Sequence, residues 1–131
     1  MMLRADLKKI ARGRLQDAEV LNKAGRYDGA VYLCGYAVEI ALKARICYTL
    51  KWPGFPSTRK EFEGYQSFRT HNLVVLLHLS GAEDKIKTRY FADWSVVVDW
   101  DPEARYRSIG SASPQDVAAM IESTKAVLEA L

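Results

Sequence analysis

Apolar residues in the first part of the chain recur at steps of three and four, the spacing of a helix with one buried face. Charged residues occupy most positions between them, which predicts an amphipathic helix over residues 3–24. Gly25 is expected to end this helix, because glycine readily adopts the left-handed conformation found at helix ends. The apolar positions are Leu7, Ala11, Leu15, Ala18 and Leu21.

Residues 28–50 predict a second helix, with Asp28 as the residue that caps its N-terminus. Apolar residues surround this helix on most sides, which is typical of a central, buried helix. One polar stripe interrupts the apolar surface at steps of four, three and four residues. It consists of Tyr32, Tyr36, Glu39 and Lys43.

The stretch over residues 52–69 is the least regular part of the chain. Pro53, Gly54 and Pro56 break the preceding helix, and a charged segment follows. Two interpretations stay open for the aromatic residues of this loop: they form a partner surface on a mobile segment, or the loop folds back on the core. These residues are Trp52, Phe55, Phe62, Tyr65 and Phe68.

Two shorter helices are expected next. One covers residues 71–80, begins near Thr70 or Asn72 and ends at Gly81. The other covers residues 83–98. Its last four residues are mostly β-branched, but an isolated strand would have nothing to pair with.

The last helix has the clearest start signal. A loop over residues 99–112 precedes it, and Ser113 is expected as its N-cap, with Pro114 at its first position. Asp116 favours the positive end of the helix. Apolar residues then keep the helical period to residue 131.

These elements predict an all-α fold, an up-and-down bundle of four to five helices. The chain has 131 residues, of which 49% are hydrophobic and 27% charged, a length and composition typical of one globular domain. No internal repeat or composition change divides it. We therefore expect a single domain over residues 1–131.

Cysteine use and hydropathy indicate a cytoplasmic protein. Cys34 and Cys47 fall on one predicted helix, about 20 Å apart at 1.5 Å per residue, too far to form a disulfide with each other. We expect them as buried thiols in a reducing compartment. No apolar run has the roughly 18 residues of a membrane span, and no spacing of Cys and His predicts a metal site.

Net charge is +3, too small to indicate a nucleic-acid binder by itself. The excess is concentrated in residues 1–26, where seven basic residues outnumber three acidic ones. We interpret this cluster as the solvated face of the first helix. The basic residues are Arg4, Lys8, Lys9, Arg12, Arg14, Lys23 and Arg26.

Three segments together resemble one known family. Residues 26–46, RYDGAVYLCGYAVEIALKARI, are similar to the central helix of HEPN domains, with the run Ala37–Ala44 as the closest part. Thr70-His71-Asn72-Leu73 resembles the start of the family's short helix. Residues 103–114, with Arg105-Tyr106 ahead of Ser113-Pro114, resemble its Arg-Tyr loop and last helix.

The resemblance implies a helical bundle, commonly a homodimer. Family members often act beside a small nucleotidyltransferase in toxin–antitoxin or defence pairs, and some bind nucleotides or cleave RNA. The ribonuclease members carry Arg-x4–6-His near the last helix. That motif is absent here, because the two histidines, His71 and His78, lie upstream of Arg105 and no arginine precedes either at that interval.

Glu39 and Lys43 are the first pair of candidate site residues. A carboxylate on a largely buried helix needs a partner. Glu39 therefore contacts a nucleotide or a partner near the cleft of the bundle, or it pairs with Lys43 one turn along the helix or with Arg105 or Arg107.

Arg105, Tyr106 and Arg107 are the second group. Two guanidinium groups beside an aromatic ring and a helix N-terminus would suit a phosphate and a base. In the alternative, Tyr106 packs on the core and the arginines pair with nearby acids. These acids are Asp99, Asp101 and Glu103.

We therefore expect a non-enzymatic HEPN-like module that binds a nucleotide, a nucleic acid or a nucleotidyltransferase partner. One alternative is a ribonuclease toxin with an altered active site that uses His71, otherwise interpreted as a capping or surface residue. A second alternative is a structural dimerisation module. We expect no catalytic residue, no metal and no cofactor.

Overall fold

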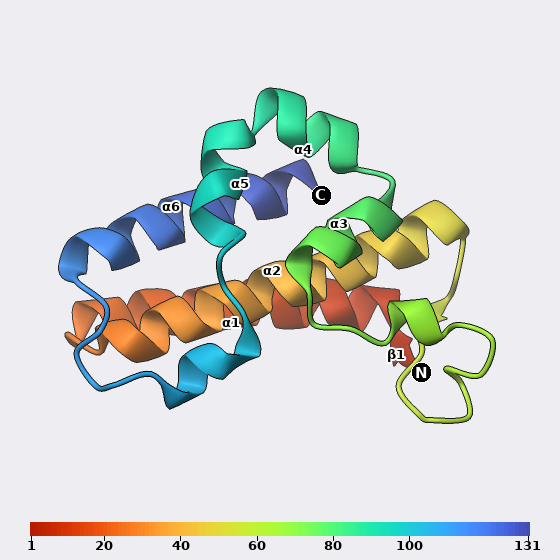
Figure 1. The fold of residues 1–131 in the computed structure, drawn as a ribbon, viewed down its shortest axis with the longest axis horizontal. Coiled ribbons are helices and arrows are strands. Elements are labelled where there is room, and N and C mark those ends of the chain that lie inside the picture. The colour runs from red at the N-terminus through yellow and green to blue at the C-terminus, as the bar shows by residue number, and fades with distance from the viewer.

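The computed structural model describes all of residues 1–131 and is almost entirely helical (Figure 1). Besides the helices it contains the two-residue strands β1 (Met2–Leu3) and β2 (Gly54–Phe55) and two short 3₁₀ helices (Gln66–Phe68 and Pro102–Tyr106). The α-helices are α1 (Arg4–Lys23), α2 (Tyr27–Leu50), α3 (Leu73–Ser80), α4 (Glu83–Arg89), α5 (Phe91–Val97) and α6 (Pro114–Ala130). The prediction of an all-α bundle is confirmed.

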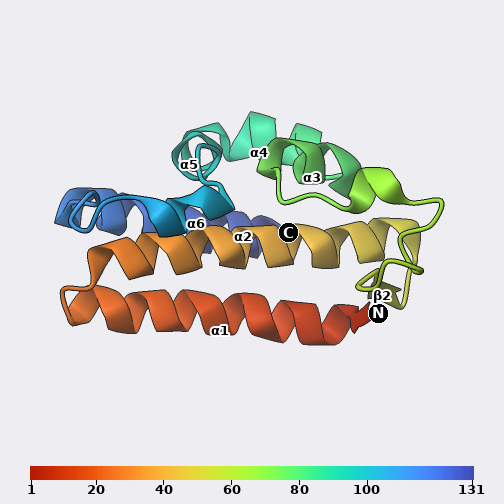
Figure 2. The same ribbon diagram turned by 60° about the horizontal axis from the view of Figure 1, so that its bottom comes forward.

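Helix α2 lies at the centre of the molecule. Figure 2 shows α1 antiparallel to it on one side, α6 running alongside, and α3 to α5 forming a short-helix layer above. Eleven residues of α2 are buried, as expected for a helix that is apolar on most sides. Three long helices thus make the frame, and the short helices close its upper face.

The α1–α2 hairpin follows the sequence pattern closely. Leu7, Ala11 and Ala18 are the buried residues of α1, all at the predicted apolar positions. Gly25 adopts a φ of 75° in the connecting turn, a conformation that a residue with a Cβ atom rarely takes. The predicted helix boundaries are correct to within one residue at each end of this hairpin.

Trp100 packs directly against the backbone of α2 at Gly35. A Cβ atom at Gly35 would lie 2.0 Å from Cδ2 of the indole, so only glycine allows this approach. Tyr36 meets the same indole edge-on, with ring centroids 5.1 Å apart, and Tyr32 lies 6.2 Å away. Tyr32 and Tyr36, at the N-terminal end of the polar stripe, therefore form an aromatic cluster with Trp100.

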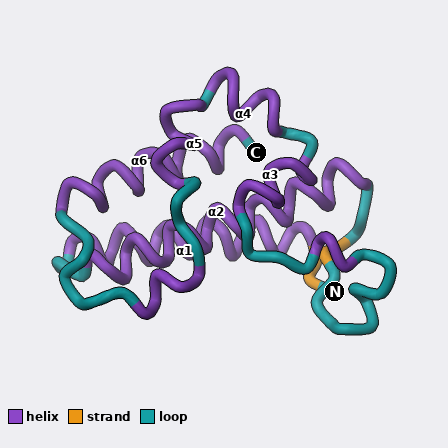
Figure 3. The backbone as a smooth tube through the Cα atoms, viewed as in Figure 1, coloured by secondary structure: helices purple, strands orange, loops and turns teal.

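The loop between α2 and α3 folds back on the core, which decides between the two interpretations given above. Lys51 ends α2 with a left-handed φ of 57°, and β2 pairs antiparallel with β1. Phe55 and Phe62 are buried, and Trp52 and Phe68 are partly buried, whereas Tyr65 is exposed. Figure 3 shows this loop folded beside the N-terminal strand.

The start of α2 differs from the prediction. The N-cap position is Arg26, so the assignment of Asp28 as the cap is wrong. The Asp28 carboxylate instead accepts hydrogen bonds from the backbone N–H groups of Gly110 (2.7 Å) and Ala112 (2.9 Å). These two bonds hold the pKa of Asp28 below its usual value of 3.8. Asp28 thus fastens the loop before α6 to α2.

The second half of the chain contains one more helix than expected. The helix predicted over residues 83–98 is interrupted at Tyr90, whose φ of −128° separates α4 from α5. The predicted ends of α3 are confirmed, with Asn72 as the N-cap and Gly81 at a φ of 75°. Ser113 and Asp116 form a capping box at the start of α6.

Both cysteines are buried and free, as expected. Burial raises the pKa of the Cys34 thiol to about 11, so this group stays protonated at neutral pH. None of the helices combines the length and apolar character needed to cross a membrane.

Candidate functional site

Glu39 is the centre of the candidate site. Its side chain is only 3% exposed, yet both carboxylate oxygens have cationic or ring-nitrogen partners. Lys43 Nζ donates to Oε2 at 3.0 Å, and His71 Nδ1 lies 3.0 Å from Oε1. The predicted pair with Lys43 is therefore present, and the pairs with Arg105 and Arg107 are not.

His71 joins this pair from outside α2. It lies in the extended segment just before α3, and its side chain is 62% exposed. Because Nδ1 faces Glu39, the ring has a fixed orientation and its Nε2 atom faces away from the carboxylate. Glu39 thus positions two side chains, Lys43 from α2 and His71 from the loop before α3.

These two groups open onto a hollow of about 400 Å³. Aromatic rings and cationic groups both line it, a combination that suits a planar base and a phosphate. Arg69 lies 5.8 Å above the ring of Phe62. The lining residues are Met2, Lys43, Pro56, Ser57, Phe62, Phe68, Arg69, Thr70 and His71. We call this the aromatic hollow.

Tyr36 links Glu39 to the opposite end of the stripe. A hydrogen bond with Tyr32 is the main reason that the pKa of Tyr36 is raised, followed by burial and by the charge of Glu39, while Arg105 opposes the shift. Glu39 and Arg105 therefore both lie close enough to influence the same phenol.

Arg105, Tyr106 and Arg107 lie in and just after the 3₁₀ helix Pro102–Tyr106, which is below the N-terminal half of α2 in Figure 1. The Arg105 guanidinium stacks on the Tyr106 ring at 4.8 Å. Hydrogen bonding to the hydroxyls of Tyr106 and Tyr32 raises the pKa of Arg105. The group therefore remains a cation at every physiological pH.

The alternative for this loop is wrong. Tyr106 is 72% exposed and does not pack on the core. Neither Arg105 nor Arg107 forms an ion pair. Arg107 lines a different hollow, beside Asp28 and Asp116. Of the five candidates, the structure pairs Glu39 with Lys43, stacks Arg105 on Tyr106, and places Arg107 beside a different hollow.

Sequence reasoning missed Arg69 and the role of His71. Arg69 directly precedes Thr70-His71-Asn72-Leu73, the segment that resembles a family motif, and lies just outside it. Nothing in the sequence spacing indicated that residue 71 would meet residue 39. No group of three or more His, Cys, Asp or Glu side chains gathers where a metal ion could be held.

The comparisons with known proteins agree with this fold. No curated protein and no solved structure gives a significant match. The HEPN domain family model matches residues 5–60, which include nearly all of α1, all of α2 and the start of the following loop. The other two family-like segments, at His71 and Arg105, lie outside the match. The match confirms the inferred resemblance for residues 5–60, which form the α1–α2 hairpin and the start of the next loop.

Proposed function

We propose that this chain is a non-enzymatic HEPN-like module that binds a nucleotide or a single-stranded nucleic acid along the surface from Arg105 to the aromatic hollow. The HEPN-domain match supports a nucleotide- or RNA-related module in general. One observation carries the finer proposal. The Glu39 carboxylate lies 3.0 Å from both Lys43 Nζ and His71 Nδ1. Lys43 and His71 line the aromatic hollow together with Phe62 and Phe68.

The chemistry of this surface fits a phosphate-linked base. Lys43 and Arg69 supply cationic donors to phosphate oxygens, and the two phenylalanine rings supply a stacking wall for a base. Arg105 lies near Tyr32 and Tyr36 of the stripe, where another phosphate of a short strand would meet it. Both carboxylate oxygens of the buried Glu39 are already paired, with Lys43 and His71. Glu39 therefore positions these two side chains and does not contact the ligand itself.

The test is direct binding of nucleotides and short single-stranded RNAs, measured by calorimetry. The double variant Lys43→Ala/Arg69→Ala is expected to bind at least tenfold more weakly than wild type. Arg59→Ala/Lys60→Ala is the matched control, because both residues are exposed in the same loop and outside the hollow. Equal loss in the two variants, or no binding by wild type, would overturn the proposal.

Arg105 and Arg107 give a second matched pair. They are two residues apart and equally charged, but only Arg105 neighbours Tyr32 and Tyr36. We expect Arg105→Ala to weaken RNA binding several-fold and Arg107→Ala to leave it within a factor of two. The reverse result would move the binding surface to the hollow beside Asp28.

The ribonuclease alternative is favoured by one specific observation, the 3.0 Å contact between the Glu39 carboxylate and His71 Nδ1. A carboxylate that orients an imidazole is the arrangement of a general base. His71 Nε2 would take the proton of a ribose 2′-hydroxyl. The 2′-oxygen would attack the adjacent phosphorus, and the leaving 5′-oxygen would take up a proton.

RNA cleavage assays separate this alternative from simple binding. Cleavage by wild type, lost in His71→Ala and kept in His78→Ala, would establish it. His78 is a suitable control because it is also exposed and also lies beside a glutamate, Glu83, at 3.4 Å. Intact RNA after incubation with wild type would leave the binding function alone.

We also propose that the exposed loop after the 3₁₀ helix Pro102–Tyr106 contacts a protein, either a nucleotidyltransferase or a second copy of this chain in a toxin–antitoxin or defence pair. Ile109 is fully exposed and Tyr106 is 72% exposed, and such apolar groups gathered on one loop are typical of contact surfaces. Sedimentation of wild type and Tyr106→Ser/Ile109→Ser tests the homodimer. A monomeric wild type would exclude it.

A further inference from the structure

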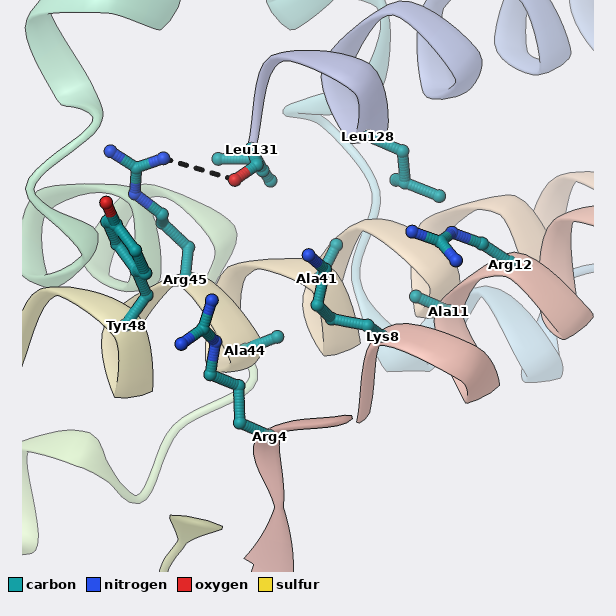
Figure 4. A pocket seen from close by; sticks show the side chains of 10 residues that line it. All are labelled: Arg4, Lys8, Ala11, Arg12, Ala41, Ala44, Arg45, Tyr48, Leu128 and Leu131. Atoms are coloured by element: carbon teal, nitrogen blue, oxygen red, sulfur yellow. Dashed lines mark hydrogen bonds between the residues drawn. The ribbon is translucent and has the colours of Figure 1, made fainter. Parts of the chain in front are cut away.

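A second hollow lies between α1, α2 and the last turn of α6 (Figure 4). Its volume is about 220 Å³. Figure 4 shows four basic side chains projecting from α1 and α2 toward the end of α6. The lining residues are Arg4, Lys8, Ala11, Arg12, Ala41, Ala44, Arg45, Tyr48, Leu128 and Leu131. We call this the basic groove.

The cations of the basic groove have no acidic side chain as a partner. Arg4, Lys8 and Arg12 follow each other at four-residue steps on α1, which spreads them over about 12 Å at 1.5 Å per residue. Arg45 faces them from α2. No acidic residue lines the groove, and none of the four cations forms an ion pair. Three of the basic residues interpreted as a solvated helix face therefore belong to a concave site.

Two of these cations are held in place. The guanidinium groups of Arg4 and Arg45 stack on the one ring of Tyr48, at 4.7 Å and 4.9 Å from its centroid. Arg45 also donates from Nη1 to the main-chain oxygen of Leu131 at 3.1 Å. Its Nε atom is buried and has no hydrogen-bond partner, and a buried donor without a partner is costly.

The shape of the groove comes from small residues. Ala11, Ala41 and Ala44 form its floor, and Leu128 and Leu131 form its apolar wall. A larger residue at any alanine would fill the space. Like charges collected around such a space repel one another unless an anion lies between them. The groove therefore has the charge, the preoriented donors and the room for an anionic ligand.

The basic groove and the aromatic hollow lie on opposite faces of α2. Successive residues of an α-helix are turned by about 100°, so Ala41 and Tyr48 face nearly opposite to Glu39 and Lys43. No residue lines both hollows. The basic groove is thus independent of the surface assigned to the proposed function.

We propose that the basic groove binds a polyphosphate group, either inorganic or the phosphate tail of a small phosphorylated molecule. A single phosphate would reach only part of a cationic row about 12 Å long, whereas linked phosphates would meet several donors together. Guanidinium forks match phosphate oxygens in pairs. The closed end at Leu128 and Leu131 favours a small ligand over a long strand.

Calorimetric titration with inorganic triphosphate tests this. Wild type should bind it saturably, orthophosphate at least tenfold more weakly, and the affinity should fall as salt is raised. Lys8→Gln/Arg12→Gln should weaken triphosphate binding at least tenfold. Lys9→Gln/Arg14→Gln is the matched control, because it removes the same charge from the same helix outside the groove, and should change binding less than twofold.

No saturable binding of triphosphate, or equal weakening in the two double variants, would overturn the proposal. A nucleoside triphosphate that binds no better than triphosphate identifies the phosphate chain as the recognised group. A nucleoside triphosphate that binds while triphosphate does not would contradict it. Lys43→Ala/Arg69→Ala should leave triphosphate binding unchanged, so this test and the RNA-binding test above can fail separately.

Discussion

The two faces of α2 differ in whether their charged side chains are paired with side chains of opposite charge. On the stripe side, the buried carboxylate of Glu39 is matched by Lys43 and His71 within 3.0 Å. On the groove side, Arg4, Lys8, Arg12 and Arg45 gather with no acidic side chain among the lining residues. Removing one partner of a matched buried charge is destabilising, because the other charge is left uncompensated. On the groove side Lys8 and Arg12 are exposed and have no such partner, so the two faces should respond differently to substitution.

The largest expected effect is at the aromatic end of the stripe side. Gly35→Ala would place a methyl group 2.0 Å from the Trp100 indole and should lower the free energy of unfolding by about 3 kcal/mol. Gly29→Ala is the control on the same helix, because its Cβ would meet only a flexible leucine end at 3.3 Å. Urea denaturation should show little loss or a small gain for Gly29→Ala. Similar losses in both would mean that Trp100 can move aside.

The next effect concerns Glu39 itself. Glu39→Gln keeps the shape but removes the charge that faces Lys43 and His71, and should lower the free energy of unfolding by about 2 kcal/mol. Glu19 serves as the comparison, since its only ion pair is a 3.8 Å contact between exposed side chains. Glu19→Gln should change stability by less than about 0.5 kcal/mol. If Glu39→Gln had the same free energy of unfolding as wild type, the charge pairs on the stripe side would contribute no more to stability than the unpaired cations on the groove side.

A smaller effect is expected where α2 begins. Because the pKa of Asp28 is lowered in the folded state, this group stabilises the protein above the unfolded pKa and loses that contribution as pH falls below about 4. The melting temperature of Asp28→Asn should therefore lie below that of wild type at pH 7. The difference should shrink as pH falls from 5 to 3. A constant difference would assign the loss to something other than the charge.

The smallest effect on stability is expected in the basic groove. Lys8→Gln/Arg12→Gln should leave the free energy of unfolding within about 0.5 kcal/mol of wild type, or raise it slightly at low salt by relieving repulsion. Chemical denaturation at two salt concentrations measures this. A clear loss of stability would show that these cations support the fold, and the contrast between the two faces of α2 would then disappear.

Helix periodicity and end signals predicted the frame of the molecule. The α1–α2 hairpin, the ends of α3 and the capped start of α6 all depend on residues within a few positions of one another. The interruption at Tyr90 was not predicted, because the apolar period continues through it. The cap assignment of Asp28 failed because its actual partners, Gly110 and Ala112, lie more than 80 residues away.

In the candidate site, too, contacts between residues close in sequence could be predicted and contacts between distant residues could not. The Glu39–Lys43 pair could be predicted, since residues four apart share a helix face. The contact between Glu39 and His71 spans 32 residues and depends on how the loop after α2 folds. Likewise, the basic run on α1 was visible in the sequence, but its meeting with Arg45 depends on packing between helices. The hydrophobic period describes residues within a few turns of one helix. It therefore indicated which charged residues share a helix face, but not which residues of other elements they would meet.

The short turn between α1 and α2 has a consequence for folding kinetics. Only residues 24–26 separate the two longest helices, so their contacts close a small loop and should form early. A substitution on the buried face of α1, such as Leu7→Ala, should mainly slow refolding. Ile86→Ala in α4, whose partners are more distant in sequence, should mainly speed unfolding. Chevron plots with the opposite pattern would place the folding nucleus in the upper layer of short helices.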